Sequence, residues 1–188
     1  SLLSLKNFFK LFEMEIFDVK HSSLRAGSMT YYVQNIKTGT HKITTACKQL
    51  DTEEKKMGIH KVDTYISFAN YIQKTRKNLI KTIKQIKSQG GYVVGYGASG
   101  RGTIIANYCN LDKNTLDFMV DDAPAKLGAY MPGTHQKIYS SDKLMENPKP
   151  TFAVLFAWPF IDDVIKRNAD YIKKGGKYQT LLGVTGSG

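Results

Sequence analysis

Three glycines follow a short apolar run at the spacing G-x-G-x-x-G, namely Gly95, Gly97 and Gly100. This spacing is typical of a loop that holds the diphosphate of a dinucleotide or a nucleotide-linked sugar. Gly95 would allow a tight turn after a strand, Gly97 would let a phosphate approach the backbone, and Gly100 would let the next helix pack closely on the sheet. That helix would offer free N–H groups and a positive dipole end to the phosphate. The alternative is a glycine-rich turn that serves packing alone.

Four polar residues near the loop are candidates for binding the same ligand. Ser99 and Arg101 stand where the loop meets the helix, and a guanidinium can bind a diphosphate through two hydrogen bonds. Asp121 and Asp122 end the next predicted strand, with Asp121 21 residues beyond Gly100. A carboxylate there can accept a ribose or sugar hydroxyl. A capping or turn aspartate is the alternative for both.

Further candidates follow later in the chain. Lys126, Thr134 and His135 are predicted in a loop at the carboxyl edge of the sheet, where open α/β sheets bind ligands. Trp158 ends a later strand and either lines the ligand pocket or closes the core. The two cysteines form no Cys/His cluster, which predicts neither a disulfide framework nor a metal site.

The elements that position these residues follow from hydrophobic patterning. From residue 91 to 183, short apolar runs alternate with helical patterns, as in a parallel sheet with right-handed crossovers. This predicts an α/β fold, a Rossmann-like and mostly parallel sheet of about five strands with flanking helices. The predicted strands are Tyr92–Val94, Leu116–Val120, Gln136–Tyr139, Phe152–Phe156 and Tyr178–Leu182, and helices are predicted after Gly100, over Ser141–Glu146 and over Pro159–Lys174.

Residues 1–40 predict a helix, Leu2–Phe12, followed by a β-hairpin of Met14–Val19 and Met29–Gln34. So small a set cannot bury its own faces. It is therefore expected to be either the end of a larger domain or an appendage docked on the C-terminal domain. Its apolar face should pack on that domain or pair with a second copy in a homodimer. Residues 41–90 predict a helical connector, with one helix from His41 to a break at Gly58 and a long one over His60–Ser88. Residues 184–188 are expected to be a mobile tail.

The net charge of +11 raises the possibility of a basic nucleic-acid-binding module. Only four of the 27 basic residues are arginine, whereas nucleic-acid interfaces rely on arginine, so a solvated lysine surface is favoured. The 188 residues suffice for one domain and part of another. No segment approaches the ~20 apolar residues of a membrane span, and the start lacks signal-peptide features. The expected location is cytoplasmic, with neither nucleic acid nor membrane as a partner.

Five segments together resemble one known family: VGYGASGRG, NYCNLD, DFMVDDAPAKLGAYMPGTH, FAVLFAW and GGKY. They are similar to the C-terminal domain of S-adenosylmethionine-dependent C-methyltransferases that act on nucleotide-linked deoxysugars. The resemblance runs from about residue 1 to residue 183, and residues 1–34 resemble the last helix and hairpin of the methyltransferase domain itself. Arg25-Ala26 and Thr30 depart from a histidine-glycine pair and an arginine usual in the family, and Arg101 stands where lysine is more common.

The resemblance implies that the zinc-binding domain, the S-adenosylmethionine loop and the catalytic Tyr/His pair lie upstream of residue 1. The chain would then be a fragment without a catalytic residue or cofactor site of its own. It would hold a nucleotide-diphosphate sugar against the methyl donor bound by the upstream methyltransferase domain. In that family, proton abstraction beside a keto group precedes attack of the carbanion on the sulfonium methyl. Alone, this chain is not expected to methylate.

The alternative function, from another class of enzyme, is that of an NAD(P)-dependent oxidoreductase or epimerase. Tyr139 and Lys143 even satisfy the Y-x-x-x-K pattern of short-chain dehydrogenases. The pair follows the glycine loop by only ~40 residues and lacks a long helix around it, so the match is interpreted as coincidence.

Overall fold

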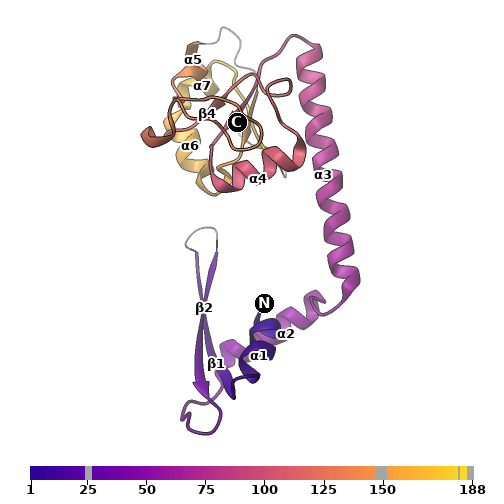
Figure 1. Ribbon diagram of the computed structural model, residues 1–188, viewed down its shortest axis with the longest axis vertical. Helices are drawn as coiled ribbons and strands as arrows, with labels where there is room; N and C mark the ends of the chain where they lie inside the picture. Colours follow the sequence, from indigo (N-terminus) through magenta and orange to yellow (C-terminus); the bar gives the residue numbers. More distant parts are fainter. Residues whose placement is uncertain (24–26, 147–151, 182, 186–188) are drawn as a thin grey trace. The chain divides into compact units, whose positions relative to one another are not determined.

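The computed structural model describes residues 1–23, 27–146, 152–181 and 183–185. The chain divides into two compact units, residues 1–71 and 72–188, and the long helix α3, Val62–Ser88, runs across the division (Figure 1). Residues 25 and 26, where the sequence departs from the family pattern, lie outside the described part, as do residues 186–188 of the predicted tail. The domain limits at residues 40, 90 and 183 stay predictions.

The first unit contains the predicted helix and hairpin. Helix α1, Leu2–Lys10, is followed by strands β1, Met14–Ser22, and β2, Ser28–Asn35, which pair antiparallel. Helix α2, Thr45–Met57, ends at Gly58, whose φ of 70° is the left-handed conformation that glycine adopts at little cost. The buried hydrophobic residues described in this unit form one small cluster, Leu2, Ile16, Val19 and Cys47.

The second unit is a six-stranded sheet with the order β5-β4-β3-β6-β7-β8. The first five strands in this order are parallel, which confirms the predicted Rossmann-like fold. Their bounds are β3 Val93–Tyr96, β4 Met119–Val120, β5 Ile138–Tyr139, β6 Phe152–Leu155 and β7 Tyr178–Thr180. Strand β8, Gly183–Thr185, pairs antiparallel with β7, so the tail predicted from residue 184 begins inside the sheet. The reason is that β7 would otherwise present an unpaired edge.

Helices cover both faces of this sheet. Because side chains alternate along a strand, Val93 packs with α3 and α4, Gly100–Cys109, on one face, while Val94 packs with α6 and α7 on the other. The helices of that second face are α5 Lys143–Glu146, α6 Ile161–Arg167 and α7 Ala169–Lys173. The single helix predicted over Pro159–Lys174 is wrong, because Asn168 leaves helical geometry between α6 and α7 and a short 3₁₀ turn, Trp158–Phe160, precedes α6.

The strand order reverses between β3 and β6. From β3 the chain moves outward through β4 and β5, then returns to place β6 on the opposite side of β3. The loops that leave β3 and β6 at the carboxyl edge therefore lead to helices on opposite faces of the sheet, α4 and α6. Open α/β sheets bind their ligands in the crevice that such a reversal creates.

Candidate functional site

The glycine loop keeps its predicted place between β3 and α4, but its glycines have other roles than predicted. Gly95 lies within β3, so it makes no turn; a β-carbon there would stand 2.6 Å from Cε of Met119. Gly97 makes the turn, with φ of +99°, and a β-carbon would stand 2.7 Å from Cβ of Ala157, in the loop after β6. The two loops of the reversal therefore touch at Gly97.

The close packing of α4 against its surroundings depends on Gly102 rather than Gly100. A β-carbon at Gly100 would meet nothing within 4 Å, so the predicted role of Gly100 is wrong. At Gly102 it would stand 2.5 Å from the carbonyl oxygen of Gly97 and 3.0 Å from Cβ of Phe156. Only one side of a helix packs against the sheet, and in the first turn of α4 the residue on that side is Gly102.

Ser99 caps this helix. Its Oγ accepts a hydrogen bond from the backbone N–H of Gly102 at 3.1 Å, and its φ and ψ are extended, as expected at an N-cap. The cap fixes the direction in which the N-terminus of α4 points.

A pocket of about 250 Å³ lies at the reversal. It brings together five of the predicted site residues, from the loops after β3 and β4, with residues from α6 that the sequence analysis did not select. The lining residues are Tyr96, Gly97, Ser99, Asp121, Asp122, Lys126, Ala157, Phe160, Asp163, Val164 and Arg167.

Asp121 is buried at the end of β4 and is held by two partners. Its Oδ1 accepts the backbone N–H of Ala123 at 2.8 Å, and its Oδ2 lies 2.9 Å from Nζ of Lys126. Each carboxylate oxygen can accept more than one hydrogen bond, so these partners position Asp121 without using up its capacity to accept a hydroxyl. The predicted turn role is also present, since the bond to Ala123 spans two residues.

Asp122 belongs to a second network. The Tyr96 hydroxyl donates to Oδ2 of Asp122 at 2.6 Å, and Nη1 of Arg167 lies 2.8 Å from the same oxygen. The Asn168 amide donates to the Tyr96 oxygen at 3.0 Å. Burial, followed by the hydrogen bond to Asp122, raises the pKa of Tyr96 far above its ordinary value, against a smaller lowering by Asn168. Tyr96 is therefore a hydrogen-bond donor at neutral pH and not a base.

Sequence reasoning missed Tyr96, Arg167 and Asn168. Two signals were available. A tyrosine between two glycines at the end of a buried strand needs a partner for its hydroxyl. Arg167 is one of only four arginines in a lysine-rich chain, and arginine is the residue suited to a fixed pair with a carboxylate.

Arg101 and Trp158 lie together beside the pocket, from opposite sides of the reversal. The guanidinium carbon of Arg101, in the first turn of α4, lies 5.6 Å from the ring centroid of Trp158, within the range of a cation–π contact. Neither residue is among those that line the pocket. Trp158 keeps 41% of its surface exposed, so it does not close the core.

Thr134 and His135 are not at this site. They line a separate pocket with Asn110, Asp112 and Lys113, the segment that leads into β4. The prediction that they lie at the carboxyl edge of the sheet is wrong. A connection between parallel strands must return to the amino edge before the next strand begins, and β5 starts three residues after His135. Tyr139 and Lys143 also stand apart from the pocket, with Nζ of Lys143 4.7 Å from the tyrosine ring centroid.

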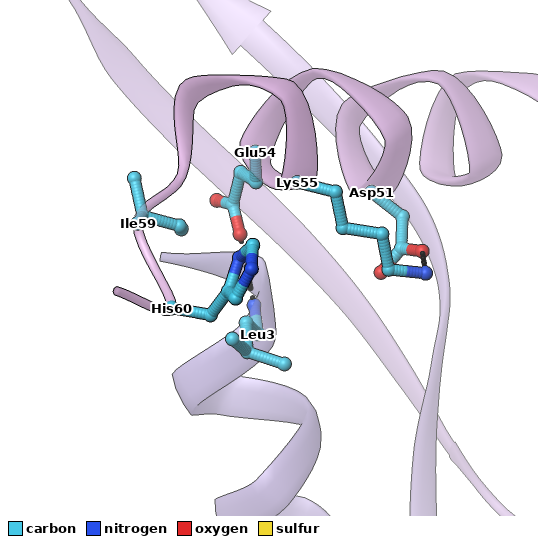
Figure 2. Close-up of a pocket in the computed structure, with 6 residues that line it drawn as sticks. All are labelled: Leu3, Asp51, Glu54, Lys55, Ile59 and His60. Atoms are coloured by element: carbon cyan, nitrogen blue, oxygen red, sulfur yellow. Dashed lines mark hydrogen bonds and ion pairs between the residues drawn. The ribbon is translucent and has the colours of Figure 1, made fainter. Parts of the chain in front are cut away.

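The first unit has a pocket of its own, about 400 Å³, lined by Leu3, Asp51, Glu54, Lys55, Ile59 and His60. Figure 2 shows Glu54 directed at the start of α1, where its carboxylate accepts the backbone N–H groups of Leu2 and Leu3 at 2.6 and 3.0 Å. Asp51 pairs with Lys6 and Lys55 at 2.8 and 2.6 Å. These acids hold α1 and α2 together, which is a structural role.

The described residues contain neither of two other kinds of site. No group of three or more His, Cys, Asp or Glu side chains among them could hold a metal ion. None of the helices in the described segments combines the length and apolar character needed to cross a bilayer.

Residues 23–182 match the family described as C-methyltransferase C-terminal domain. The chain belongs to this family. A C-methyltransferase, NovU of Streptomyces niveus, is 25% identical over 178 residues, which cover 95% of this chain and 42% of that protein. The chain thus spans less than half the length of this relative. The match confirms the resemblance drawn from the glycine loop and from the segment DFMVDDAPAKLGAYMPGTH, which contains Asp121 and Lys126.

Proposed function

We propose that this chain is the part of a C-methyltransferase that binds a nucleotide-diphosphate sugar, in the pocket beside the glycine loop. The observation that carries the proposal is the position of this pocket, at the strand-order reversal and between the loops that leave β3 and β6. Ligands of open α/β sheets bind there. In the full-length protein, an upstream domain would bring S-adenosylmethionine to the bound sugar.

The charges around the pocket suit the parts of such a ligand. Asp121 and Asp122 can accept hydroxyl groups of the ribose or the sugar. The first turn of α4 contains no acid and carries Arg101. A cation at the positive end of a helix dipole is unfavourable by about 0.3–1 kcal/mol, and a bound diphosphate would reverse the sign of this interaction. The exposed Arg101 is thus placed to meet a phosphate.

S-adenosylmethionine fits these residues poorly. It carries a sulfonium cation and no phosphate, so it offers Arg101 and the N-terminus of α4 a single carboxylate in place of the two or more negative charges of a diphosphate. Asp121 and Asp122, two of the three carboxylates among the lining residues, are already paired with Lys126 and Arg167. We therefore assign no step of methyl transfer to residues of this chain; its task is to bind and orient the methyl acceptor.

Calorimetry on the chain with dTDP, UDP, NAD, S-adenosylmethionine and an oligonucleotide tests the proposal. We expect saturable heat with the two nucleoside diphosphates. Arg101→Ala should weaken their binding by roughly 1.5–3 kcal/mol, about 10- to 150-fold, because a hydrogen bond to a charged group is lost. Lys81→Ala, which removes an exposed cation of α3, is the matched control and should bind unchanged.

Three results would count against the proposal. Tighter binding of NAD than of both diphosphates would indicate an oxidoreductase. Binding of the oligonucleotide alone would indicate a nucleic-acid module. Unchanged diphosphate affinity in Arg101→Ala would place the diphosphate away from α4.

A further inference from the structure

The loop after β6 presents two large aromatic side chains to solvent beside the pocket. Phe156, the residue directly after β6, is buried with 1% of its surface exposed, whereas Trp158 and Phe160 expose 41% and 57%. Both belong to the 3₁₀ turn Trp158–Phe160. Phe160 lines the pocket, and the guanidinium of Arg101 lies over the ring of Trp158. Two exposed aromatic side chains, Trp158 and Phe160, therefore stand directly after β6 at the carboxyl edge of the sheet.

The pocket is too small to receive a whole nucleotide sugar. Its volume of about 250 Å³ falls below the roughly 300–1,000 Å³ of sites that enclose a drug-sized ligand. Its polar lining includes Asp121, Asp122 and Asp163 with Lys126 and Arg167, which suits hydroxyl groups. The apolar part of the lining is Tyr96, Ala157, Phe160 and Val164, and among these Phe160 is the exposed aromatic ring, in the 3₁₀ turn that also holds Trp158. The base of a nucleotide must therefore lie outside the pocket.

We propose that Trp158, with Phe160 beside it, is the surface on which the nucleobase stacks. This inference rests on the proposed function and adds where the ligand's base lies. An aromatic base stacks on an exposed indole whatever its hydrogen-bonding pattern, since every base has a π face. Arg101, already over the indole, would then link the base-stacking surface to the diphosphate at the N-terminus of α4. The hydroxyl-bearing remainder of the ligand enters the pocket.

The backbone around Trp158 supports such a rigid surface. Pro159 follows it and restricts φ within the turn, and the N–H of Phe160 donates to the carbonyl oxygen of Ala157 at 2.9 Å. Ala157 in turn lies against Gly97, because a β-carbon at Gly97 would stand 2.7 Å from its Cβ. The stacking surface is therefore attached directly to the glycine loop.

Trp158 is the only tryptophan in the chain, so its fluorescence reports on this position alone. We would titrate the chain with dTDP and with inorganic pyrophosphate, which lacks a base. We expect dTDP to quench the fluorescence at the concentrations where calorimetry shows binding, and pyrophosphate to bind with little quenching. In calorimetry, Trp158→Ala should weaken dTDP about 5- to 150-fold and leave pyrophosphate unchanged, whereas Trp158→Phe should retain most of the dTDP affinity.

Tyr130→Ala removes another exposed aromatic side chain from the same unit and is the control for a general loss of aromatic surface. Circular dichroism checks that each variant is folded. Binding of dTDP without a fluorescence change, or with equal affinity in Trp158→Ala, would overturn the stacking inference and leave the proposed function standing. Absence of binding by both dTDP and pyrophosphate would instead overturn the proposed function, and the inference with it.

Discussion

Replacing Gly102 by alanine should destabilise the second unit, whereas the same replacement at Gly100 should not. The two glycines lie in the first turn of α4, two positions apart. A β-carbon at Gly102 would stand 2.5 Å from the carbonyl oxygen of Gly97 and 3.0 Å from Cβ of Phe156. At Gly100 it would point into open space. The two variants thus add the same methyl group to the same helix in opposite surroundings.

The expected magnitudes follow from these contacts. Overpacking costs about 1–3 kcal/mol, and the upper part of this range applies to Gly102 because the obstructing oxygen is backbone and cannot rotate away. Alanine in place of glycine within a helix stabilises the folded state by about 0.5–1 kcal/mol. Gly102→Ala should therefore lose about 2 kcal/mol and Gly100→Ala should gain about 0.5–1 kcal/mol. At roughly 2–4 °C per kcal/mol, the melting temperatures of the two variants should differ by roughly 5–12 °C.

Urea unfolding followed by tryptophan fluorescence measures this difference in the correct unit, because the single tryptophan, Trp158, belongs to residues 72–188. Unfolding of the first unit contributes no tryptophan signal. Equal stabilities of the two variants, or a larger loss in Gly100→Ala, would refute the assignment of close packing to Gly102. It would also restore the role that the G-x-G-x-x-G spacing predicts for Gly100.

Two further predictions concern buried groups in each unit. Burial, with smaller effects of neighbouring groups, raises the pKa of Tyr96 and of Tyr178 above the ordinary value of about 10. The stability that their protonated hydroxyls contribute is complete below pH ~10 and is lost as the pH rises toward the folded-state pKa. The free energy of unfolding of the second unit should therefore fall above pH ~10, and it should fall less in Tyr178→Phe. Parallel plots of this free energy against pH for the two proteins would contradict this account. In the first unit, Glu54→Ala should lower the stability by about 0.5–2 kcal/mol and speed amide exchange in the first turn of α1, because Glu54 caps that turn. A loss of stability no larger than that of Glu53→Ala, which changes an exposed glutamate, would show that the cap is unimportant.

Local sequence was sufficient for much of the second unit. The continuous apolar run Phe152–Phe156 predicts a strand buried on both faces, and β6 is such a strand. Glycine is also informative where the backbone itself requires it. Gly58, with φ of 70°, ends α2 as predicted, and Gly90, with φ of 76°, follows the end of α3. These properties depend on a residue and its near neighbours, so they can be predicted without knowing the fold.

The roles of the loop glycines could be predicted only in part. Spacing indicated a turn followed by a helix, and both are present. Which glycine supports the turn and which the packing depends on the rotation of α4 about its axis. That rotation is set by Phe156, 54 residues beyond Gly102, and by the carbonyl oxygen of Gly97. No local pattern contains this information.

Tertiary structure decided which polar residues share a site. Asp122 meets Tyr96 and Arg167, which lie 26 residues before it and 45 residues after it in the chain. Thr134 and His135, much closer to Asp122 in sequence, stand at the other edge of the sheet because their loop must return there to enter β5. The sequence by itself determined the five parallel strands, the glycine turn and the acids that end β4, since backbone conformation and burial depend on short segments. It did not determine β8, which forms by pairing with β7. Which side chains contact one another was decided by the strand order, which is a property of the whole sheet.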